Sequence, residues 1–274
     1  MEQLNQRRAG TGVSGPQSVV VDAGPDARVS GPQLALAKLT LSLRITGVRP
    51  DGYHLLDADM VTIDLADELW FGPGDALVVE DAVAGPGSPL TVGAGPDNLV
   101  RRALELIGRK ASVRLVKRIP AGAGLGGGSA DAAAVLRWAG RQGDVERARE
   151  LGADVAFCAR GGRARVSGVG DILEPLPFEA GIPYTLLTPP LPVSTVAAYR
   201  MWDTLGGPTG AGANDLEAAA LALEPSLASW KDRLGRATGL VPTLAGSGST
   251  WWVPGAFPDV KGAVVVRTAQ PGGA

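Results

Sequence analysis

Apolar and polar residues alternate over residues 34–45, which read Leu-Ala-Leu-Ala-Lys-Leu-Thr-Leu-Ser-Leu-Arg-Ile. A period of two predicts a half-buried strand. Residues 50–52, Pro-Asp-Gly, predict a turn because proline presets φ and glycine accepts a positive φ. Residues 60–65 and 76–80 predict two further strands, which the Gly-Pro-Gly sequence at 72–74 separates.

Helical spacing replaces this alternation in the middle of the chain. Apolar residues recur at helical spacing over residues 98–107, and Asp97 is placed to cap that helix. Residues 112–119 predict a strand, and an alanine-rich helix follows over residues 130–139 with Ser129 as its N-cap. The remaining pattern predicts a helix over 144–151, strands or turns at 164–167 and 171–173, and a strand at 184–187. Helices around 197–205, 215–223 and 227–234 and two final strands complete the predicted elements.

The order of these elements indicates the fold class. Strands and helices are mixed without strict alternation, which favours an α+β fold in two lobes over a doubly wound sheet. Prolines at positions 175, 177 and 183 mark a boundary. We predict a first lobe over residues 34–176 and a second over residues 177–274. Residues 1–33, rich in Gly, Ser, Pro and Gln, predict a poorly ordered or loosely attached tail.

Composition narrows the classes of function. Hydrophobic residues make up 45% and charged residues 20% of the 274-residue chain, as in ordinary soluble domains. The formal net charge of -2 gives no reason to expect a nucleic-acid or membrane partner. No apolar run reaches the ~18–20 residues of a membrane span, and the run at 19–21 is too short for a signal peptide. We therefore expect a cytoplasmic protein.

Cysteine and histidine are too few for several kinds of site. A single cysteine, Cys158, excludes an intrachain disulfide and a cysteine-based zinc cluster, and its apolar neighbours predict a buried side chain. A single histidine, His54, excludes a metal site built on a histidine pair.

The most informative segment joins the predicted strand at 112–119 to the helix at 130–139. Residues 120–129 read Pro-Ala-Gly-Ala-Gly-Leu-Gly-Gly-Gly-Ser. Each glycine would cost about 0.5–1 kcal/mol inside regular structure, so such a run belongs where the backbone must approach another group closely. The helix that follows directs unpaired N–H groups and a positive dipole end at the loop. Together these features predict a phosphate site, whereas a flexible linker would not be flanked so tightly.

Three kinds of phosphate loop compete for this segment. A Walker loop needs a lysine, and no lysine lies between Lys117 and Lys231. The Gly-x-Gly-x-x-Gly spacing that starts at Gly122 matches a dinucleotide fingerprint. However, the preceding strand carries Arg114, Lys117 and Arg118, while a central parallel strand should be almost wholly apolar. The third kind is the ATP loop of a different fold.

The loop resembles the central phosphate loop of the GHMP kinases, which include galacto-, homoserine, mevalonate and phosphomevalonate kinases. Other motifs agree in the same order, and they occupy residues 37–40, 49–54, 96–99, 151–155, 161–162, 168–171, 214–217 and 246–249. Within this superfamily the set is most similar to the 4-diphosphocytidyl-2-C-methyl-D-erythritol kinases of the non-mevalonate isoprenoid pathway. The resemblance covers residues 36–254. It implies a ribosomal-protein-S5-like first lobe and a ferredoxin-like second lobe.

The resemblance also implies an ATP site. ATP would be the phosphoryl donor, and Mg²⁺ would arrive with it, held by phosphates, water and the Ser129 hydroxyl rather than by an acidic cluster. Asn98 would contact the adenine, and Ser247 would belong to a turn that lines the phosphates. The ATP-binding residues implied are Pro120, Ala121, Gly122, Ala123, Gly124, Leu125, Gly126, Gly127, Gly128, Ser129, Ala130, Asn98 and Ser247.

Two residues are implied to be catalytic. Asp154 matches the carboxylate that acts as base toward the attacking hydroxyl, and the lesser alternative from its sequence context is an aspartate that caps a helix. Lys38 matches the lysine that orients this hydroxyl and stabilises developing charge, although strand alternation alone could point it to solvent. Thr40 replaces the asparagine that is usual in the family, and it should share a face with Lys38.

Three residues are implied to bind a cytidine diphosphate group on the acceptor. Tyr53 would stack on the cytosine, His54 would hydrogen-bond it, and Tyr199 would stack on its other face, unless Tyr199 simply packs on an apolar helix face. We therefore expect a kinase that phosphorylates the 2-hydroxyl of 4-diphosphocytidyl-2-C-methyl-D-erythritol as a monomer or homodimer.

Three alternatives remain open at this point. The first is a GHMP kinase for another small alcohol, which would leave Tyr53 and His54 without a base to bind. The second is a catalytically impaired ATP-binding relative, suggested by Thr40 and by a shortened segment before residue 151. The third is a dinucleotide-dependent oxidoreductase.

Overall fold

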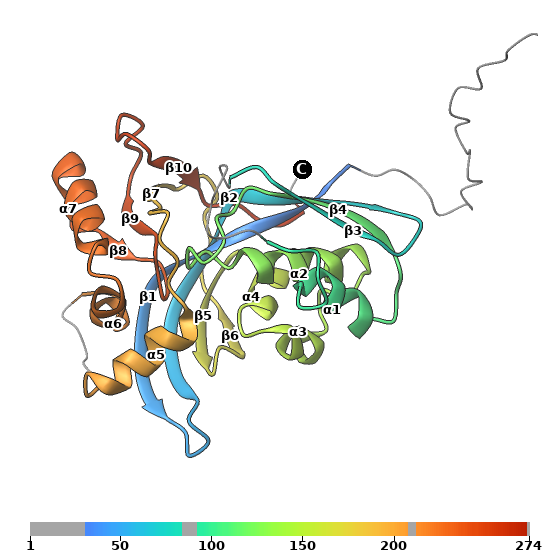
Figure 1. Cartoon of the computed structure of the whole chain (residues 1–274), viewed down its shortest axis with the longest axis horizontal. Coiled ribbons are helices and arrows are strands. Elements are labelled where there is room, and N and C mark those ends of the chain that lie inside the picture. Colours follow the sequence, from blue (N-terminus) through green and yellow to red (C-terminus); the bar gives the residue numbers. More distant parts are fainter. Residues whose placement is uncertain (1–30, 84–91, 208–211, 273–274) are drawn as a thin grey trace, which may run out of the picture.

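The computed structural model describes residues 31–83, 92–207 and 212–272. Of the predicted tail, residues 1–30 therefore lie outside the described residues. The described chain forms a six-stranded and a four-stranded sheet, each with helices packed against it (Figure 1). The division at residue 176, which falls between these two sheets, stays a prediction.

The six-stranded sheet is organised around its longest strand, β2. Its order is β3-β4-β2-β5-β6, and β1 also pairs with β2. Residues 68–72 of β2 pair antiparallel with β4 and residues 56–61 pair antiparallel with β5, while β1 runs antiparallel along most of the length of β2. The strands are β1 (Gln33–Val48), β2 (His54–Gly72), β3 (Leu77–Asp81), β4 (Ser112–Lys117), β5 (Arg163–Gly168) and β6 (Ile172–Pro175).

Four helices gather on one side of this sheet (Figure 1). They are α1 (Leu99–Leu106), α2 (Gly127–Trp138), α3 (Val145–Leu151) and α4 (Val155–Arg160). Helix α2 lies at the centre, and its residues 130–136 are all buried. Alanine fills most of these positions, so the helix can approach β1 and its neighbouring helices closely, and the main core forms around it.

The four-stranded sheet has its own hydrophobic core. Its order is β10-β7-β9-β8, with antiparallel neighbours throughout. Leu227 and Leu234 of one helix pack with Trp251 in this second core. The elements are β7 (Pro183–Leu187), α5 (Thr195–Thr204), α6 (Glu217–Leu223), α7 (Leu227–Thr238), β8 (Thr243–Leu244), β9 (Trp251–Pro254) and β10 (Val264–Arg267).

Hydrogen bonds join β1 directly to the segment before α6. The backbone N–H of Leu43 donates to the Ala213 carbonyl at 2.8 Å, and the N–H of Asp215 donates back to Leu43 at 3.0 Å. The buried Asp215 carboxylate also accepts the N–H of Ile45 at 2.9 Å. Segments far apart in sequence are thus tied together beside the middle of β1.

Several element boundaries differ from the sequence-based predictions. Asn98, rather than Asp97, caps α1, because its side chain accepts the N–H of Val100. Helix α2 begins at Gly127, so Ser129 lies in its first turn, and Gly126 holds the N-cap position with a positive φ of 70°. Strand β2 extends far beyond the predicted 60–65, and α4 was not predicted.

Candidate active site

The glycine loop packs between β1 and the turn that precedes β9. The N–H of Lys38 donates to the Leu125 carbonyl at 3.0 Å, and the N–H of Thr250 donates to the Ala123 carbonyl at 3.2 Å. Gly124 has a φ of 76°, and a Cβ on it would lie 2.1 Å from the carbonyl oxygen of Ala245. Only glycine fits there, which explains why the loop needs glycine at this position.

The loop ends where α2 begins. The Gly126 carbonyl accepts the first helical hydrogen bond, from the N–H of Ala130 at 2.8 Å. The N–H groups of a first turn have no partner within their own helix. No side chain among the described residues caps this end. The helix therefore directs free donors and its positive dipole end outward, as an anion site requires.

Lys38 packs against the start of α2. The residue is only 5% exposed, and a Cβ on Gly126 would lie 2.8 Å from its Cγ atom. Its Nζ atom donates to the Thr40 hydroxyl at 3.1 Å and pairs with Oδ2 of Asp154 at 3.5 Å. Register shifts in the β1–β2 pairing flank residues 38–40 on both sides, and such bulges re-aim side chains next to functional sites.

Asp154 stands at the N-cap position of α4 without acting as a cap. Its side chain makes no capping bond to the described backbone, and it is 29% exposed. In this structure Asp154 thus pairs with Lys38 and does not cap the helix, and its role as the base stays a prediction. Cys158, one turn further along α4, is buried, and burial raises the pKa of its thiol to about 12.

The turn that contains Ser247 closes the other side of this centre. A Cβ on Gly246 would lie 3.2 Å from Nζ of Lys38. The buried amide of Asn214 donates to the carbonyls of Leu244 and Gly246, and Ser247 shares a 2.9 Å hydrogen bond with Thr195 at the start of α5. The turn is thus held from two elements.

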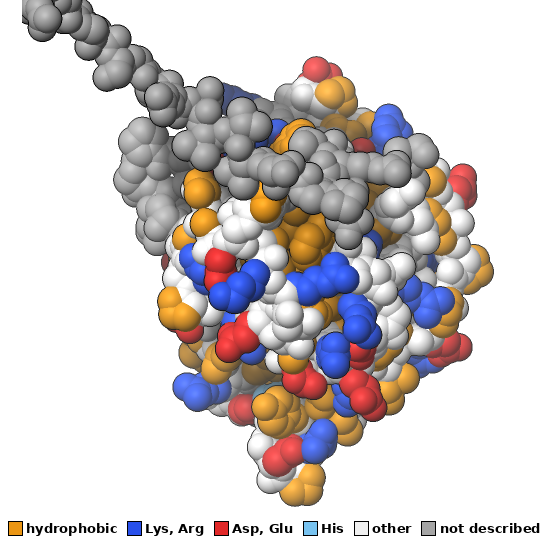
Figure 2. Space-filling model, turned by 90° about the vertical axis from the view of Figure 1, so that its right-hand side faces the viewer, with side chains coloured by type: hydrophobic (Ala, Val, Ile, Leu, Met, Phe, Trp, Pro, Cys, Tyr) orange, Lys and Arg blue, Asp and Glu red, His pale blue; other side chains and the backbone are white. Residues whose placement is uncertain are grey.

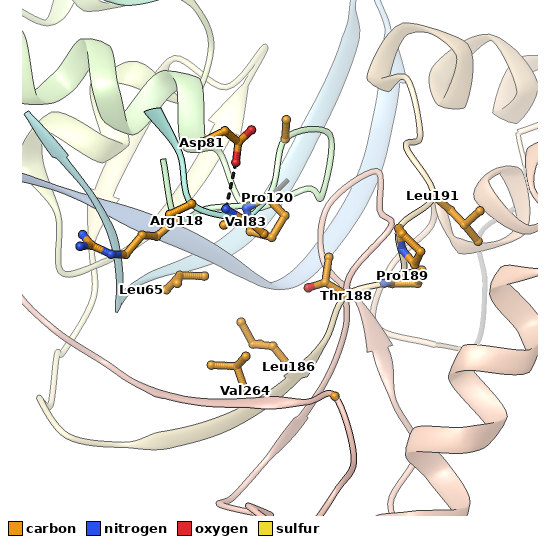
Figure 3. Close-up of a pocket in the computed structure, with 14 residues that line it drawn as sticks. Leu65, Asp81, Val83, Arg118, Pro120, Leu186, Thr188, Pro189, Leu191 and Val264 are labelled. Atoms are coloured by element: carbon orange, nitrogen blue, oxygen red, sulfur yellow. Dashed lines mark hydrogen bonds between the residues drawn. The ribbon is translucent and has the colours of Figure 1, made fainter. Parts of the chain in front are cut away.

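A cavity of about 570 Å³ opens beside the first residues of the glycine loop. Pro120 and Ala121 border it, whereas Lys38, Asp154 and Asn98 do not, so we do not place the reaction centre there. Residues from both sheets line this cavity (Figure 3). They include Leu65, Asp81, Val83, Arg118, Leu186, Thr188, Pro189, Leu191 and Val264.

Comparisons with known proteins show the family of this chain. The domain family described as GHMP kinases N terminal domain matches residues 98–172. A 4-diphosphocytidyl-2-C-methyl-D-erythritol kinase of Paracoccus denitrificans is 39% identical over 80% of this chain and 84% of the relative. One of Cereibacter sphaeroides is 37% identical over 87% and 95% of the respective chains. This chain belongs to the 4-diphosphocytidyl-2-C-methyl-D-erythritol kinase family.

A solved structure supports the same family. The crystal structure of a 4-(cytidine 5'-diphospho)-2C-methyl-D-erythritol kinase superposes with a TM-score of 0.65 at 32% identity, covering 87% of this chain and 99% of that one. Together with the two sheets, this similarity confirms the predicted two-lobed α+β fold of the GHMP kinases.

The family's predicted cytosine-binding residues lie at the junction of β2 and α5. His54 contacts Tyr199, with ring centroids 4.8 Å apart, and its Nε2 atom lies 2.8 Å from Oδ1 of Asp203. Trp202 meets the same imidazole edge-on. Tyr199 is largely buried, which raises the pKa of its phenol to about 12. The structure thus joins His54 and Tyr199, while Tyr53 stands in the preceding turn with 64% of its surface exposed.

Asn98, which the family resemblance assigns to adenine contact, is already engaged within the protein. Its Oδ1 atom caps α1, and its Nδ2 atom donates to the Gly93 carbonyl at 2.8 Å. An adenine contact would have to use the second lone pair of Oδ1 or the second N–H. That role stays a prediction.

Sequence reasoning missed a buried charged cluster that adjoins the loop. Lys117, which counted only as a basic strand residue, forms ion pairs with Asp67 and Asp131. Asp131 offered one signal, because it is a lone charge inside the alanine run of α2. Asp67 offered none, since its partners lie far away in sequence.

The described residues carry neither an acidic metal cluster nor a membrane span. Among them, no three His, Cys, Asp or Glu side chains are placed to hold a metal ion, and none of their helices has the length and hydropathy to cross a bilayer. Lys and Arg side chains are interspersed with Asp and Glu on the face shown in Figure 2.

Proposed function

We propose that the protein transfers the γ-phosphoryl group of ATP to the 2-hydroxyl of 4-diphosphocytidyl-2-C-methyl-D-erythritol. The observation that carries this proposal is the pairing of Lys38 with Asp154 at 3.5 Å, directly beneath the uncapped start of α2. A base and a cation next to a phosphate-binding helix end are the parts that phosphoryl transfer to an alcohol needs.

Asp154 is the proposed acceptor of the proton from the 2-hydroxyl. The hydroxyl oxygen forms the new bond to the γ-phosphorus as the bond to the β,γ-bridging oxygen breaks, and ADP leaves. Lys38 faces both Asp154 and the glycine turn at 246, so its ammonium can stabilise the charge that develops on the transferred group. The Thr40 hydroxyl, which accepts from Nζ, holds this ammonium in place.

The donor phosphates are proposed to lie against residues 124–129, where the first N–H groups of α2 point outward. Mg²⁺ is proposed to arrive with ATP, with the Ser129 hydroxyl as a protein ligand. Oxygen ligands from phosphates, water and a hydroxyl suit this hard cation. When bound, the ion would neutralise part of the phosphate charge. The glycine loop would orient the donor phosphates.

The acceptor's cytosine is proposed to bind at Tyr53, His54 and Tyr199. The carboxylate of Asp203 accepts the N–H of Nε2 of His54, which leaves Nδ1 of a neutral imidazole as an acceptor. An acceptor can receive the 4-amino group of cytosine but not the 4-oxo group of uracil. In this tautomer of the neutral imidazole, the contact with Asp203 suits a cytidine-bearing acceptor.

The direct test is an assay of ADP release with ATP and a panel of alcohols. We expect turnover with 4-diphosphocytidyl-2-C-methyl-D-erythritol and a product in which ³¹P NMR places the new phosphate on the 2-oxygen. Homoserine, mevalonate and galactose should give only background rates. Faster turnover with one of these alcohols would replace the proposed acceptor, and absence of ATP-dependent turnover with every alcohol would support an impaired relative.

A further inference from the structure

Three ionisable side chains meet in the interior beside the glycine loop. Nζ of Lys117 lies 2.7 Å from Oδ2 of Asp131, and it also hydrogen-bonds Oδ2 of Asp67. No more than 3% of any of the three side chains is exposed. Oδ1 of Asp131 has no hydrogen-bond partner among the described residues.

Such a cluster is a costly way to hold a core together. Each buried charge loses its hydration, and apolar side chains of similar volume often stabilise a fold as well or better. The three residues also come from three elements, β2, β4 and α2, that the main core already packs together. Bulk stability is therefore a weak explanation for the cluster.

The cluster hydrogen-bonds the backbone directly before the loop. The other oxygen of Asp67, Oδ1, accepts the backbone N–H groups of Arg118 and Ile119, the latter at 2.8 Å. These residues immediately precede Pro120. The same carboxylate thus binds the Lys117 ammonium through one oxygen and fixes the entry of the loop through the other.

The cluster also touches the chain directly after the loop. A Cβ on Gly127, the first residue of α2, would lie 3.2 Å from Nζ of Lys117 and 3.1 Å from Ile119. Asp131 lies one turn further along the same helix and binds the same ammonium. Lys117 therefore connects both ends of the loop, at residues 118–119 and at residues 127–131.

We propose that Lys117 is a positioning residue for the nucleotide phosphates, acting through Asp67 and Asp131. Its ammonium sets the separation of the two loop ends and hence the direction of the first N–H groups of α2. Because its side chain is almost wholly buried, it acts through the backbone of the loop. The inference rests on the proposed function only as far as ATP binds at this loop.

The test compares Lys117→Met with a matched control, Lys110→Met. Lys110 also pairs with an aspartate, Asp75, close to β4, but its side chain is 81% exposed. Calorimetry would measure the affinities for ADP and CMP below the unfolding temperature, and an assay would separate KM for ATP from KM for the acceptor. We expect Lys117→Met to weaken ADP binding and raise KM for ATP by roughly tenfold to a hundredfold, the scale of effect of a small misplacement. CMP affinity and Lys110→Met should stay at wild-type values.

A pair of substitutions at Asp131 keeps the proposal testable if Lys117→Met does not fold. Asp131→Asn retains an oxygen that accepts from Lys117, so ADP affinity should stay within roughly threefold of wild type, while Asp131→Leu, which removes that oxygen, should weaken ADP binding clearly. A folded Lys117→Met or Asp131→Leu variant with wild-type ADP affinity, or an equal loss of ADP and CMP binding, would overturn the proposal. The proposed function fails separately, if wild type binds ADP but does not phosphorylate the cytidine acceptor.

Discussion

Thr40 shows how a single side chain can adapt the reaction centre. It is buried beside Lys38, and its hydroxyl accepts a hydrogen bond from Nζ at 3.1 Å. Lys38 thus has two polar partners in the described structure, Thr40 and Asp154. Removing either one leaves a buried ammonium with less compensation for its lost hydration.

Substitution of Thr40 should therefore change turnover in a graded way. Thr40→Val keeps the shape but removes the acceptor, and one hydrogen bond to a charged group is worth about 1.5–3 kcal/mol, so turnover should fall without being abolished. Thr40→Asn restores an acceptor on a longer arm, so turnover should hold or rise. Steady-state assays with the cytidine acceptor check both. A silent Thr40→Val together with an inactive Thr40→Asn would indicate a site rebuilt for another acceptor.

Asp154→Asn should keep the fold and lose most of the turnover. The amide cannot take the hydroxyl proton, and positioned proton transfer contributes roughly 10²–10⁴-fold. The loss should lie toward the lower end of that range because phosphoryl transfer passes through a loose transition state. Single-turnover kinetics would measure the chemical step, and ADP affinity should stay unchanged. Glu150→Gln, on the neighbouring helix α3, is the matched control, and an Asp154→Asn rate equal to that of the control would rule out the base.

At the scale of elements, local sequence signals located most helices and strands but set their limits less well. Asp97 and Asn98 are adjacent capping residues, and only the packed loop, in which Asn98 also bonds Gly93, selects the second. Strand β2 is longer than predicted because it pairs with β1, β4 and β5. A local sequence pattern cannot indicate such pairings.

The same contrast holds for the site. The proximity of Lys38, Thr40, Asp154 and the glycine loop could be predicted because each lies in a short motif. The contact of His54 with Asp203 and the burial of Lys117 depend on partners far away in the chain. Strand alternation also could not place Lys38, because residues 35–40 are buried on both faces of β1.

The contact between the start of β2 and α5 predicts how the acceptor is selected. Tyr199→Ala removes a ring packed against His54 and should weaken acceptor binding by about 1–3 kcal/mol, the worth of one stacked base, while leaving ADP binding unchanged. CMP should inhibit wild type more strongly than UMP, because Nδ1 of a neutral imidazole that donates from Nε2 to Asp203 can accept the 4-amino group of cytosine but cannot donate to the 4-oxo group of uracil. Inhibition constants measure both effects, with Arg200→Ala as the control on the same helix. Equal inhibition by CMP and UMP would remove His54 as the reader of the base.

At the scale of the whole molecule, the buried cluster beside the loop links folding to pH. Burial, with the negative charge of Asp67, raises the pKa of Asp131 to about 8, although Lys117 lies against it. Burial lowers the pKa of Lys117, but the two carboxylates outweigh it and raise this pKa overall. The unfolded chain releases the Asp131 proton near its ordinary pKa of 3.8, whereas the folded protein keeps it to a higher pH.

The free energy of unfolding should therefore fall as pH rises from about 4 to about 8, because the folded state binds this proton more tightly than the unfolded state does. Asp131→Asn removes the titration, so its stability should decline less over the same range. The groups that face Asp131 are Lys117 from β4, Asp67 from β2 and Cys158 from α4, and all three are retained in this variant. Urea unfolding of both proteins at several pH values measures the difference, and parallel curves would contradict the prediction.

Gly124 and Ala245 approach each other so closely that related chains cannot freely exchange one segment without the other. A Cβ on Gly124 would reach within 2.1 Å of the Ala245 carbonyl and 2.9 Å of the Gly248 carbonyl, so there is no room for even one methyl group. A recombinant that combines the glycine loop of one kinase with the turn at residues 245–248 of another would need backbones that still fit together at this contact. Substitutions in the two segments should therefore covary among related chains, although more than a hundred residues of chain separate the segments.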